Sequence, residues 1–365
     1  MRRMILLVGV IVVALLVRGH AQSKNLDIYW IDVEGGASTL LVAPSGESLL
    51  YDAGFGPPNA MNDRDAKRIV AAAQAAGLKK IDYFVLSHYH ADHVGGLPAL
   101  AKMIPIGRYF DHGDTVEDVD RPRLDLYKQV AGTARTTVKP GDSIPLKGVK
   151  AQVVSSDGQF IAKAINGGGP NALCATAERK APAPPENWRN VGMLFTFGKF
   201  TFLDLADLDW ASEMALTCPV NKVGTVTIWQ TDRHGNLFGA GAPAMLGAIK
   251  PQVIIVNNGP RKGLGQVDTA VQSLTRPGYQ ETAPSYAYEK IARLPGVEGI
   301  WQGHIALADP DHNTSRDQIA NFEETADCKG NWIRASIAPD GKFTITNGRN
   351  GFSKSYVARS PQSGS

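Results

Sequence analysis

The stretch Leu86-Ser-His-Tyr-His-Ala-Asp-His-Val-Gly-Gly96 decides the fold. It follows a short apolar run that predicts a buried strand ending in a loop. His88 and His90 stand at alternate positions of extended backbone, so both side chains can reach one metal ion. Asp92 and His93 lie beyond the bend and can reach a second ion a few ångströms away. Solvated histidines on a polar loop are the alternative, but ligand-type side chains at this spacing predict a metal site.

The N-terminus has the pattern of a cleavable signal peptide. Arg2 and Arg3 precede the apolar run Met4–Val17, and small residues allow cleavage after Ala21. A membrane anchor is the alternative, but this run is shorter than the roughly 20 residues that a spanning helix needs. We therefore expect residues 1–21 to be removed and the mature protein to be exported, either periplasmic or secreted, with no membrane span.

Composition indicates one large domain without a strong charge bias. The chain has 365 residues, 43% of them hydrophobic, which is enough for a sizeable core over residues 22–365. Loss of residues 1–21 lowers the count of Lys and Arg from 38 to 35 and leaves the 35 Asp and Glu unchanged. The mature net charge is then close to zero, so bulk charge gives no support to a nucleic-acid partner.

Strand and helix patterns alternate along most of the chain. Strands are predicted at Leu26–Val33, Ser38–Val42, Ser48–Asp52, Ile106–Phe110, Val191–Phe197, Lys199–Leu205, Thr225–Gln230, Val253–Val256 and Val297–Trp301, with helices from Asn62 or Asp63 to Gly77, over Val116–Val130, Trp210–Leu216 and near Ser285–Arg293. Residues 156–189 are rich in Gly, Ala and Pro, which predicts a long surface loop that could cover the site. Two strand-rich halves with helices between them predict a four-layer α/β sandwich with its site along one edge.

The three cysteines, Cys174, Cys218 and Cys328, are far apart and lack metal-ligand spacing. One disulfide and one free thiol fit an oxidising compartment, and the pairing is open. Each is otherwise expected to be a buried small hydrophobe.

At this point the chain resembles a family. The motif His88–His93, with Asp207 and His234 behind it, resembles that of metallo-β-lactamase-fold hydrolases. The resemblance covers roughly residues 26–304 and implies a four-layer αββα sandwich. Four segments more narrowly resemble the nuclease-like domain of the competence protein ComEC: Ile31–Leu40, Leu50–Gly54, Asn190–Asp207 and Val253–Gly259.

The resemblance also implies roles. His88 and His90 would bind a first ion, Asp92 and His93 a second, and Asp207 would bridge both. Asp52 would orient a metal-bound histidine. The expected metal ligands are therefore His88, His90, Asp92, His93, Asp207 and His234.

Two departures from the family pattern leave the number of ions, one or two, open. The only histidine between His93 and Asp207 is His112, which comes too early to be the usual third ligand of the first ion. Where related sequences carry paired histidines, this chain has Arg233-His234.

Four further residues are expected to line the substrate site: His112, Asn190, Arg261 and His304. Asn190 matches an asparagine of the ComEC-like pattern. Arg261 and its neighbour Lys262 lie in a glycine-rich loop and could hold an anionic substrate, with an exposed basic turn as the alternative.

These ligands predict a hydrolase in which a metal-activated water is the nucleophile and Asp92 orients that water. Zinc is the expected metal and manganese the alternative. The resemblance favours a phosphodiester-type or other small-molecule substrate. Cleavage of a lactam, lactone or thioester is a second hypothesis, and a metal-binding protein without turnover is a third.

Overall fold

The computed structural model describes residues 25–183, 185–266, 286–325 and 327–360. The signal peptide expected at residues 1–21 lies outside these ranges. Within them, no helix is both long and apolar enough to cross a membrane.

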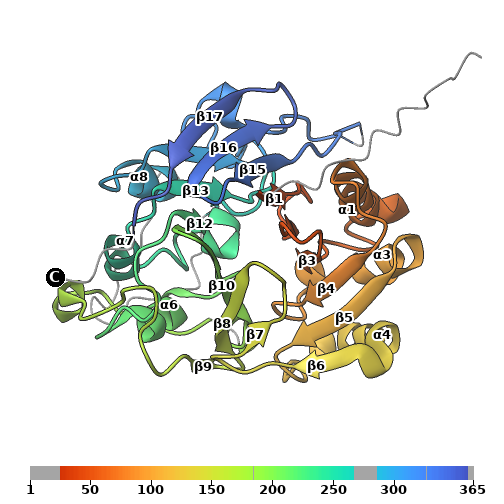
Figure 1. Ribbon diagram of the computed structural model, residues 1–365, viewed down its shortest axis with the longest axis horizontal. Coiled ribbons are helices and arrows are strands. Elements are labelled where there is room, and N and C mark those ends of the chain that lie inside the picture. The colour runs from red at the N-terminus through yellow and green to blue at the C-terminus, as the bar shows by residue number, and fades with distance from the viewer. Residues whose placement is uncertain (1–24, 184, 267–285, 326, 361–365) are drawn as a thin grey trace, which may run out of the picture.

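Two sheets form the centre of the described structure (Figure 1). The first has nine strands in the order β17 (Ser353–Val357), β16 (Lys342–Asn347), β15 (Ile333–Ile337), β1 (Leu26–Trp30), β2 (Thr39–Val42), β3 (Ser48–Tyr51), β4 (Ile81–Val85), β5 (Ile106–Asp111) and β6 (Arg135–Thr137) among the described residues. The second, counted in the same way, has β14 (Gly299–Gln302), β13 (Val253–Val256), β12 (Ile228–Gln230), β11 (Phe200–Asp204), β10 (Gly192–Phe197), β8 (Lys150–Ser156) and β7 (Ser143–Ile144), with β9 (Gln159–Phe160) paired to β8.

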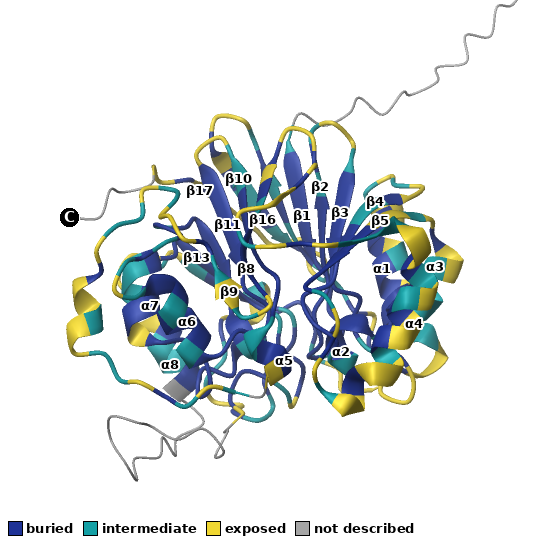
Figure 2. Ribbon diagram, turned by 90° about the horizontal axis from the view of Figure 1, so that it is seen from below, coloured by how far each residue is buried: buried dark blue, intermediate teal, exposed yellow. Residues whose placement is uncertain are grey.

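Helices cover the outer face of each sheet, as Figure 2 shows from the side. On the first sheet lie α1 (Arg64–Ala75), α3 (Leu97–Met103) and α4 (Arg121–Ala131). On the second lie α6 (Trp210–Thr217), α7 (Pro243–Ile249) and α8 (Tyr286–Ala292). The expected four-layer αββα sandwich is therefore confirmed.

The inner faces of the sheets share an apolar core. Trp30 of β1 meets Phe202 of β11 edge to face, with ring centroids 5.4 Å apart. Polar bonds also cross the interface: the Tyr51 hydroxyl donates to the carbonyl of Val191, and Thr39 bonds Gln230 at 3.1 Å. These buried pairs satisfy groups that would otherwise oppose burial.

Parallel pairing explains why the functional loops meet. β3, β4 and β5 run parallel in the first sheet, and β11, β12, β13 and β14 run parallel in the second. The carboxyl ends of parallel strands lie at one edge of a sheet, where the connecting loops gather. In Figure 2, α2 (Ala91–Val94) and α5 (Pro185–Trp188) lie between the two halves at this edge.

Two expectations need correction. The helix predicted from Val116 begins at Arg121, because Pro122 favours the first turn of a helix, and a short 3₁₀ turn precedes it. The segment 156–189 is not purely a surface loop: Glu186 and Asn187 in α5 are buried.

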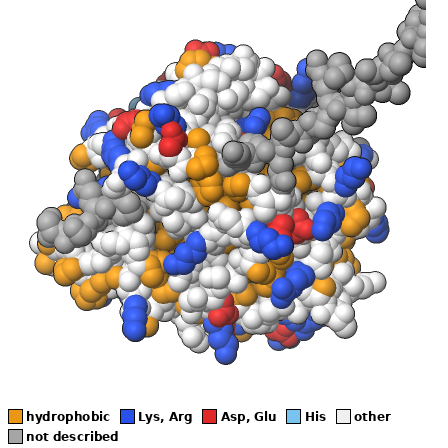
Figure 3. Space-filling view, in the orientation of Figure 1, with side chains coloured by type: hydrophobic (Ala, Val, Ile, Leu, Met, Phe, Trp, Pro, Cys, Tyr) orange, Lys and Arg blue, Asp and Glu red, His pale blue; other side chains and the backbone are white. Residues whose placement is uncertain are grey.

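Charged side chains are dispersed over the face in Figure 3, where Lys and Arg are interspersed with neutral side chains and several lie beside acids. On the described surface, Arg359 forms an ion pair with Glu298.

Cys174 forms a disulfide with Cys218, and Cys328 is a buried free thiol. The bridge ties the 3₁₀ turn Ala172–Ala175 to the end of α6.

We expect the double variant Cys174→Ser, Cys218→Ser to lose stability, because the bridge closes a loop with a sequence separation of 44 residues. Chain-entropy arguments give about 4 kcal/mol for such a loop. Urea unfolding of both proteins measures the loss, and thiol titration in denaturant without reductant should count one thiol per wild-type chain. Three reactive thiols before reduction would contradict the pairing.

Candidate metal centre

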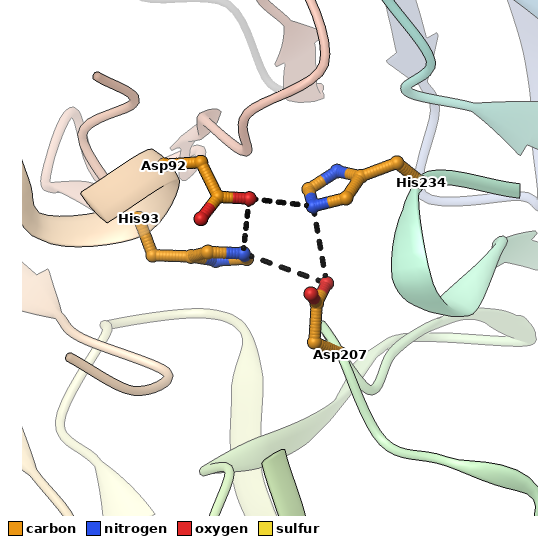
Figure 4. A group of neighbouring side chains, drawn as sticks. All are labelled: Asp92, His93, Asp207 and His234. Atoms are coloured by element: carbon orange, nitrogen blue, oxygen red, sulfur yellow. Dashed lines mark hydrogen bonds and ion pairs between the residues drawn. The ribbon is translucent and has the colours of Figure 1, made fainter. Parts of the chain in front are cut away.

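Four buried side chains converge at the edge where the two halves meet (Figure 4). Asp92 and His93 lie in α2, which follows β4 of the first sheet. Asp207 follows β11, and His234 follows β12, both of the second sheet. Their relative exposures are 7%, 0%, 7% and 2%, in the order named. Each half of the sandwich thus supplies one carboxylate and one imidazole.

The four ligand atoms alternate around a common centre. His234 Nε2 lies 3.0 Å from Asp92 Oδ2 and 3.2 Å from Asp207 Oδ1. His93 Nε2 lies 3.4 Å from each of the same two oxygens. Ligands at 2.0–2.1 Å from a tetrahedral zinc ion are about 3.3 Å apart. The spacing of this group therefore fits a single divalent ion.

Unpaired polar atoms point to the same conclusion. Three buried atoms, His88 Nε2, His93 Nε2 and Asp207 Oδ1, have no hydrogen-bond partner in the described structure. Leaving such atoms unpaired in the interior is costly, and a metal ion would satisfy them. The donor set fits a metal.

The charges of the group are strongly coupled. Burial raises the pKa of Asp92, but Lys262 and His93 outweigh burial and hold it well below its usual range. Burial lowers the pKa of His93, yet Asp92 and Asp207 raise it well above its ordinary value. A proton on His93 would therefore compete with a metal ion for the same carboxylates.

A hydrogen-bonded carboxylate lies behind the histidines. Asp52 Oδ2 is 2.7 Å from His93 Nδ1 and accepts the Ser87 hydroxyl at 2.7 Å, while Oδ1 accepts the Ser87 amide at 2.8 Å. With its proton on Asp52, the Ser87 oxygen can accept the Nδ1 proton of His88 at 3.0 Å. This network assigns the proton of both rings to Nδ1 and leaves both Nε2 atoms free to ligate.

His90 takes a different direction from the one expected. Its ring lies beside His88, with centroids 4.5 Å apart, but its Nε2 is 3.7 Å from both Glu117 and Asp120. These three form a separate group capable of holding a metal. The structure therefore places His88 and His90 side by side but does not bring His90 to the four-ligand group.

His112, expected near substrate, is buried behind the metal loop. Its Nε2 contacts Glu186 at 3.0 Å. Glu186 also accepts the Tyr89 amide at 3.0 Å and the Thr115 hydroxyl at 2.6 Å. Burial raises the pKa of Glu186, but the bonds from His112 and Thr115 outweigh it and lower the value to about 2. His112 thus fixes a buried carboxylate that supports the backbone of the metal loop.

Asn190 is also buried, and its side chain bonds to the backbone. Its Oδ1 accepts the amide of Asp207 at 3.3 Å, and its Nδ2 donates to the carbonyl of Asn187. Asn190 therefore fixes the backbone of Asp207, one of the four candidate metal ligands. The structure brings Asp207 to the group, whereas Asp204 stays buried beneath it and bonds the amide of Ala206.

The remaining two residues predicted to line the substrate site, Arg261 and His304, bond to other partners. Arg261 is exposed and pairs with Glu324 at 2.7 Å, because its side chain turns outward from its loop. His304 is fully buried, and its Nδ1 and Nε2 lie 3.1 Å and 3.2 Å from the backbone carbonyls of Ile305 and Glu323.

The neighbour of Arg261 points inward instead. Lys262 Nζ contacts Asp92 Oδ2, and its side chain is 38% exposed, so it links the metal group to solvent. The next residue, Gly263, allows the loop to pack against the backbone of His234: its φ is +90°, and a Cβ there would lie 2.0 Å from the carbonyl oxygen of His234. Sequence reasoning considered both basic residues but could not tell which one turns inward, and it missed Glu186, a single acid in a Pro-rich segment.

Residues 32–204 match the model of the Metallo-beta-lactamase superfamily. The chain is 29% identical over 112 residues to the atrochrysone carboxyl ACP thioesterase dmxR1 of Cryptosporiopsis sp. (strain 8999), covering 30% of this chain and 32% of that protein. It is 24% identical over 123 residues to an atrochrysone carboxyl ACP thioesterase of Aspergillus fumigatus, covering 34% of this chain and 24% of that protein. The matched region thus spans a third or less of these relatives.

Among solved structures, the chain is similar to the metallo-beta-lactamase fold protein YhfI from Bacillus subtilis, at 14% identity and a TM-score of 0.42, over 76% of this chain and 95% of that one. The two sheets, their outer helices and the superfamily match show that this chain has the metallo-β-lactamase fold.

Proposed function

We propose that this protein is a metal-dependent hydrolase in which Asp92, His93, Asp207 and His234 hold a divalent ion, with zinc as the expected metal. The observation that carries the proposal is the buried group of alternating carboxylates and imidazoles, with ligand atoms 3.0–3.4 Å apart. The superfamily match and the two thioesterase-named relatives support a hydrolase.

Such an ion supplies two things when bound: it lowers the pKa of its water toward about 7, and it polarises the bond to be cleaved. The chain supplies the remaining parts. Asp92 is the residue proposed to orient the attacking water. Lys262 brings a positive charge to Asp92 from the solvent side, where it can stabilise negative charge that develops on the substrate.

A second ion is proposed beside His88. The free Nε2 of His88 is buried, and its ring centroid is 4.1 Å from that of His93. Burial lowers the pKa of His88 well below its ordinary value, which keeps the ring neutral and able to ligate. His90 would join it only by turning away from Glu117 and Asp120. We therefore expect the second ion to bind more weakly than the first.

Two substrate classes are proposed. A thioester is favoured by the names of the two curated relatives. A phosphodiester is favoured by the ComEC-like segments and by Lys262, because an ammonium group suits a phosphate oxygen. Both reactions place negative charge on an oxygen near the metal group. Hydrolysis assays with generic thioester, phosphodiester and lactam substrates distinguish them.

The first test removes a ligand. We expect Asp207→Ala to lose the ion of the four-ligand group and to reduce turnover about 10²-fold or more, the scale of removing one preorganised electrostatic contact. Metal content by elemental analysis and rates on the three substrate types are measured together.

Asp118→Ala is the matched control, because the Asp118 side chain is exposed and, among the described residues, pairs only with Arg121. Full activity and unchanged metal content in Asp207→Ala would refute the proposed centre. Metal binding without turnover on any substrate would favour a catalytically silent protein.

The second test concerns the support of His93. Asp52→Asn keeps the shape of the side chain but removes its charge, so the His93 ring is held less firmly. We expect metal affinity to fall about 10–100-fold, as for other residues that orient a metal ligand. Competition with a chromogenic chelator measures the affinity, and unchanged far-ultraviolet dichroism excludes unfolding. An affinity equal to that of wild type would show that Asp52 has no such role.

We also propose that the protein is exported and that cleavage follows Ala21. Mass spectrometry of the natively produced protein should then find an N-terminus at or near Gln22. Intact chains beginning at Met1 in the membrane fraction would point to an anchor instead.

A further inference from the structure

A second buried group of ligand-type side chains lies apart from the four-ligand group. Asp32, His304 and Cys328 each offer one atom, and these three atoms lie within 4.8 Å of one another. The residues come from three distant parts of the chain: Asp32 follows β1, His304 follows β14, and Cys328 precedes β15. Their exposures are 4%, 0% and 6%, respectively. Such convergence in the interior requires an explanation.

One atom of this group lacks a partner, whereas His304 is bonded: its Nδ1 and Nε2 lie 3.1 Å and 3.2 Å from the backbone carbonyls of Ile305 and Glu323, and one of these contacts must open for the ring to bind an ion. Asp32 Oδ1 accepts the amide of Glu34 at 2.8 Å, but Oδ2 is buried and has no hydrogen-bond partner in the described structure. An unpaired carboxylate oxygen in the interior is costly. Burial raises the pKa of Asp32 to about 6, with His304 and Arg68 opposing the rise. A cation at this point would remove that cost.

Arg68 of α1 does not serve as that cation. Its Nη1 donates to the backbone carbonyl of Asp32 at 3.1 Å, and its Nη2 donates to the backbone carbonyl of Cys328 at 2.6 Å. Arg68 therefore fixes the backbones of two members of the group while the Asp32 side chain stays unpaired. Arg68 in helix α1 thus fixes the backbone positions of Asp32 and Cys328 relative to each other.

The chemistry of the three ligands indicates which cation would bind. A thiolate, an imidazole and a carboxylate together suit zinc, since sulfur disfavours calcium and magnesium. Around a tetrahedral zinc ion such ligand atoms are about 3.3–3.6 Å apart, so closing from within 4.8 Å needs a side-chain shift on the order of 1 Å.

A catalytic thiol is the competing interpretation. The ligand atoms of Cys328 and His304 lie within 4.8 Å of each other, but both residues are buried, and the cavity beside Asp32 has a volume of only about 10 Å³. That space accommodates about one water molecule and no substrate. Burial also argues against pairing of Cys328 with another chain.

We propose that Asp32, His304 and Cys328 form a structural zinc site, separate from the proposed catalytic centre. It would join the segment that leads into β15 to the loop after β1. That loop in turn supports the catalytic group: the amide of Ala37 donates to the carbonyl of Asp92 at 3.0 Å. Zinc bound here would therefore stabilise the backbone of Asp92 from behind.

Cobalt titration tests this site directly. The other two of the 3 cysteines are joined in a disulfide, so a cobalt–thiolate charge-transfer band can arise only from Cys328. The protein should carry Asp207→Ala and His234→Ala to remove the four-ligand group, and thiol titration should first count one free thiol. We expect the band to saturate at one equivalent of cobalt and added zinc to abolish it.

Cys328→Ala should remove the band and one zinc ion per chain by elemental analysis, whereas His312→Gln, a histidine away from the group, should leave both unchanged. Zinc should also slow alkylation of Cys328 at least 10-fold in the native protein, a measurement that needs no variant of the site. Absence of the band in folded protein with a free thiol would overturn the proposal. So would zinc content unchanged by Cys328→Ala.

Discussion

The buried carboxylate of Asp52 orients two histidines of the candidate metal centre. It accepts the Nδ1 proton of His93 directly and, through Ser87, sets the orientation of His88. One charged group thereby fixes the tautomer of two rings, and in each ring the Nε2 atom is left free. Asp52 itself adopts a φ of +63°, an uncommon conformation for a residue with a side chain. The backbone at the end of β3 thus adopts an uncommon conformation at the residue that bonds the loop after β4.

Support of this kind recurs around the centre. Glu186 holds the amide of Tyr89 within the metal loop, and Asn190 holds the amide of Asp207. Both are buried polar side chains whose bonds go to backbone or to other supporting groups. Positioning a ligand through its backbone leaves its side chain free to bind. Loops that carry metal ligands at the edge of a sheet can therefore be as rigid as the strands behind them.

The sequence is sufficient to predict the αββα sandwich and which residues could be ligands. It does not predict the direction in which each side chain points. His88, Asp92 and His93 follow a strand within one short loop, so local spacing is enough to place them together. The direction of His90 depends on Glu117 and Asp120, which are distant in sequence. The same holds for the bonding partners of the four residues predicted to line the substrate site, His112, Asn190, Arg261 and His304. Their side-chain partners are set by tertiary packing, which no local pattern encodes.

The ligands of the four-membered group are divided equally between the two sheets. Asp92 and His93 come from the loop after β4 of the first sheet, and Asp207 and His234 follow β11 and β12 of the second. An ion held by all four would therefore link the two sheets and stabilise their packing, in addition to its proposed role in catalysis. Binding at a concentration 100 times the dissociation constant adds about 2.7 kcal/mol to folding stability by mass action. Without the ion that contribution is absent, so a destabilising substitution in the core shared by the two sheets would act on a protein with less folding stability to lose.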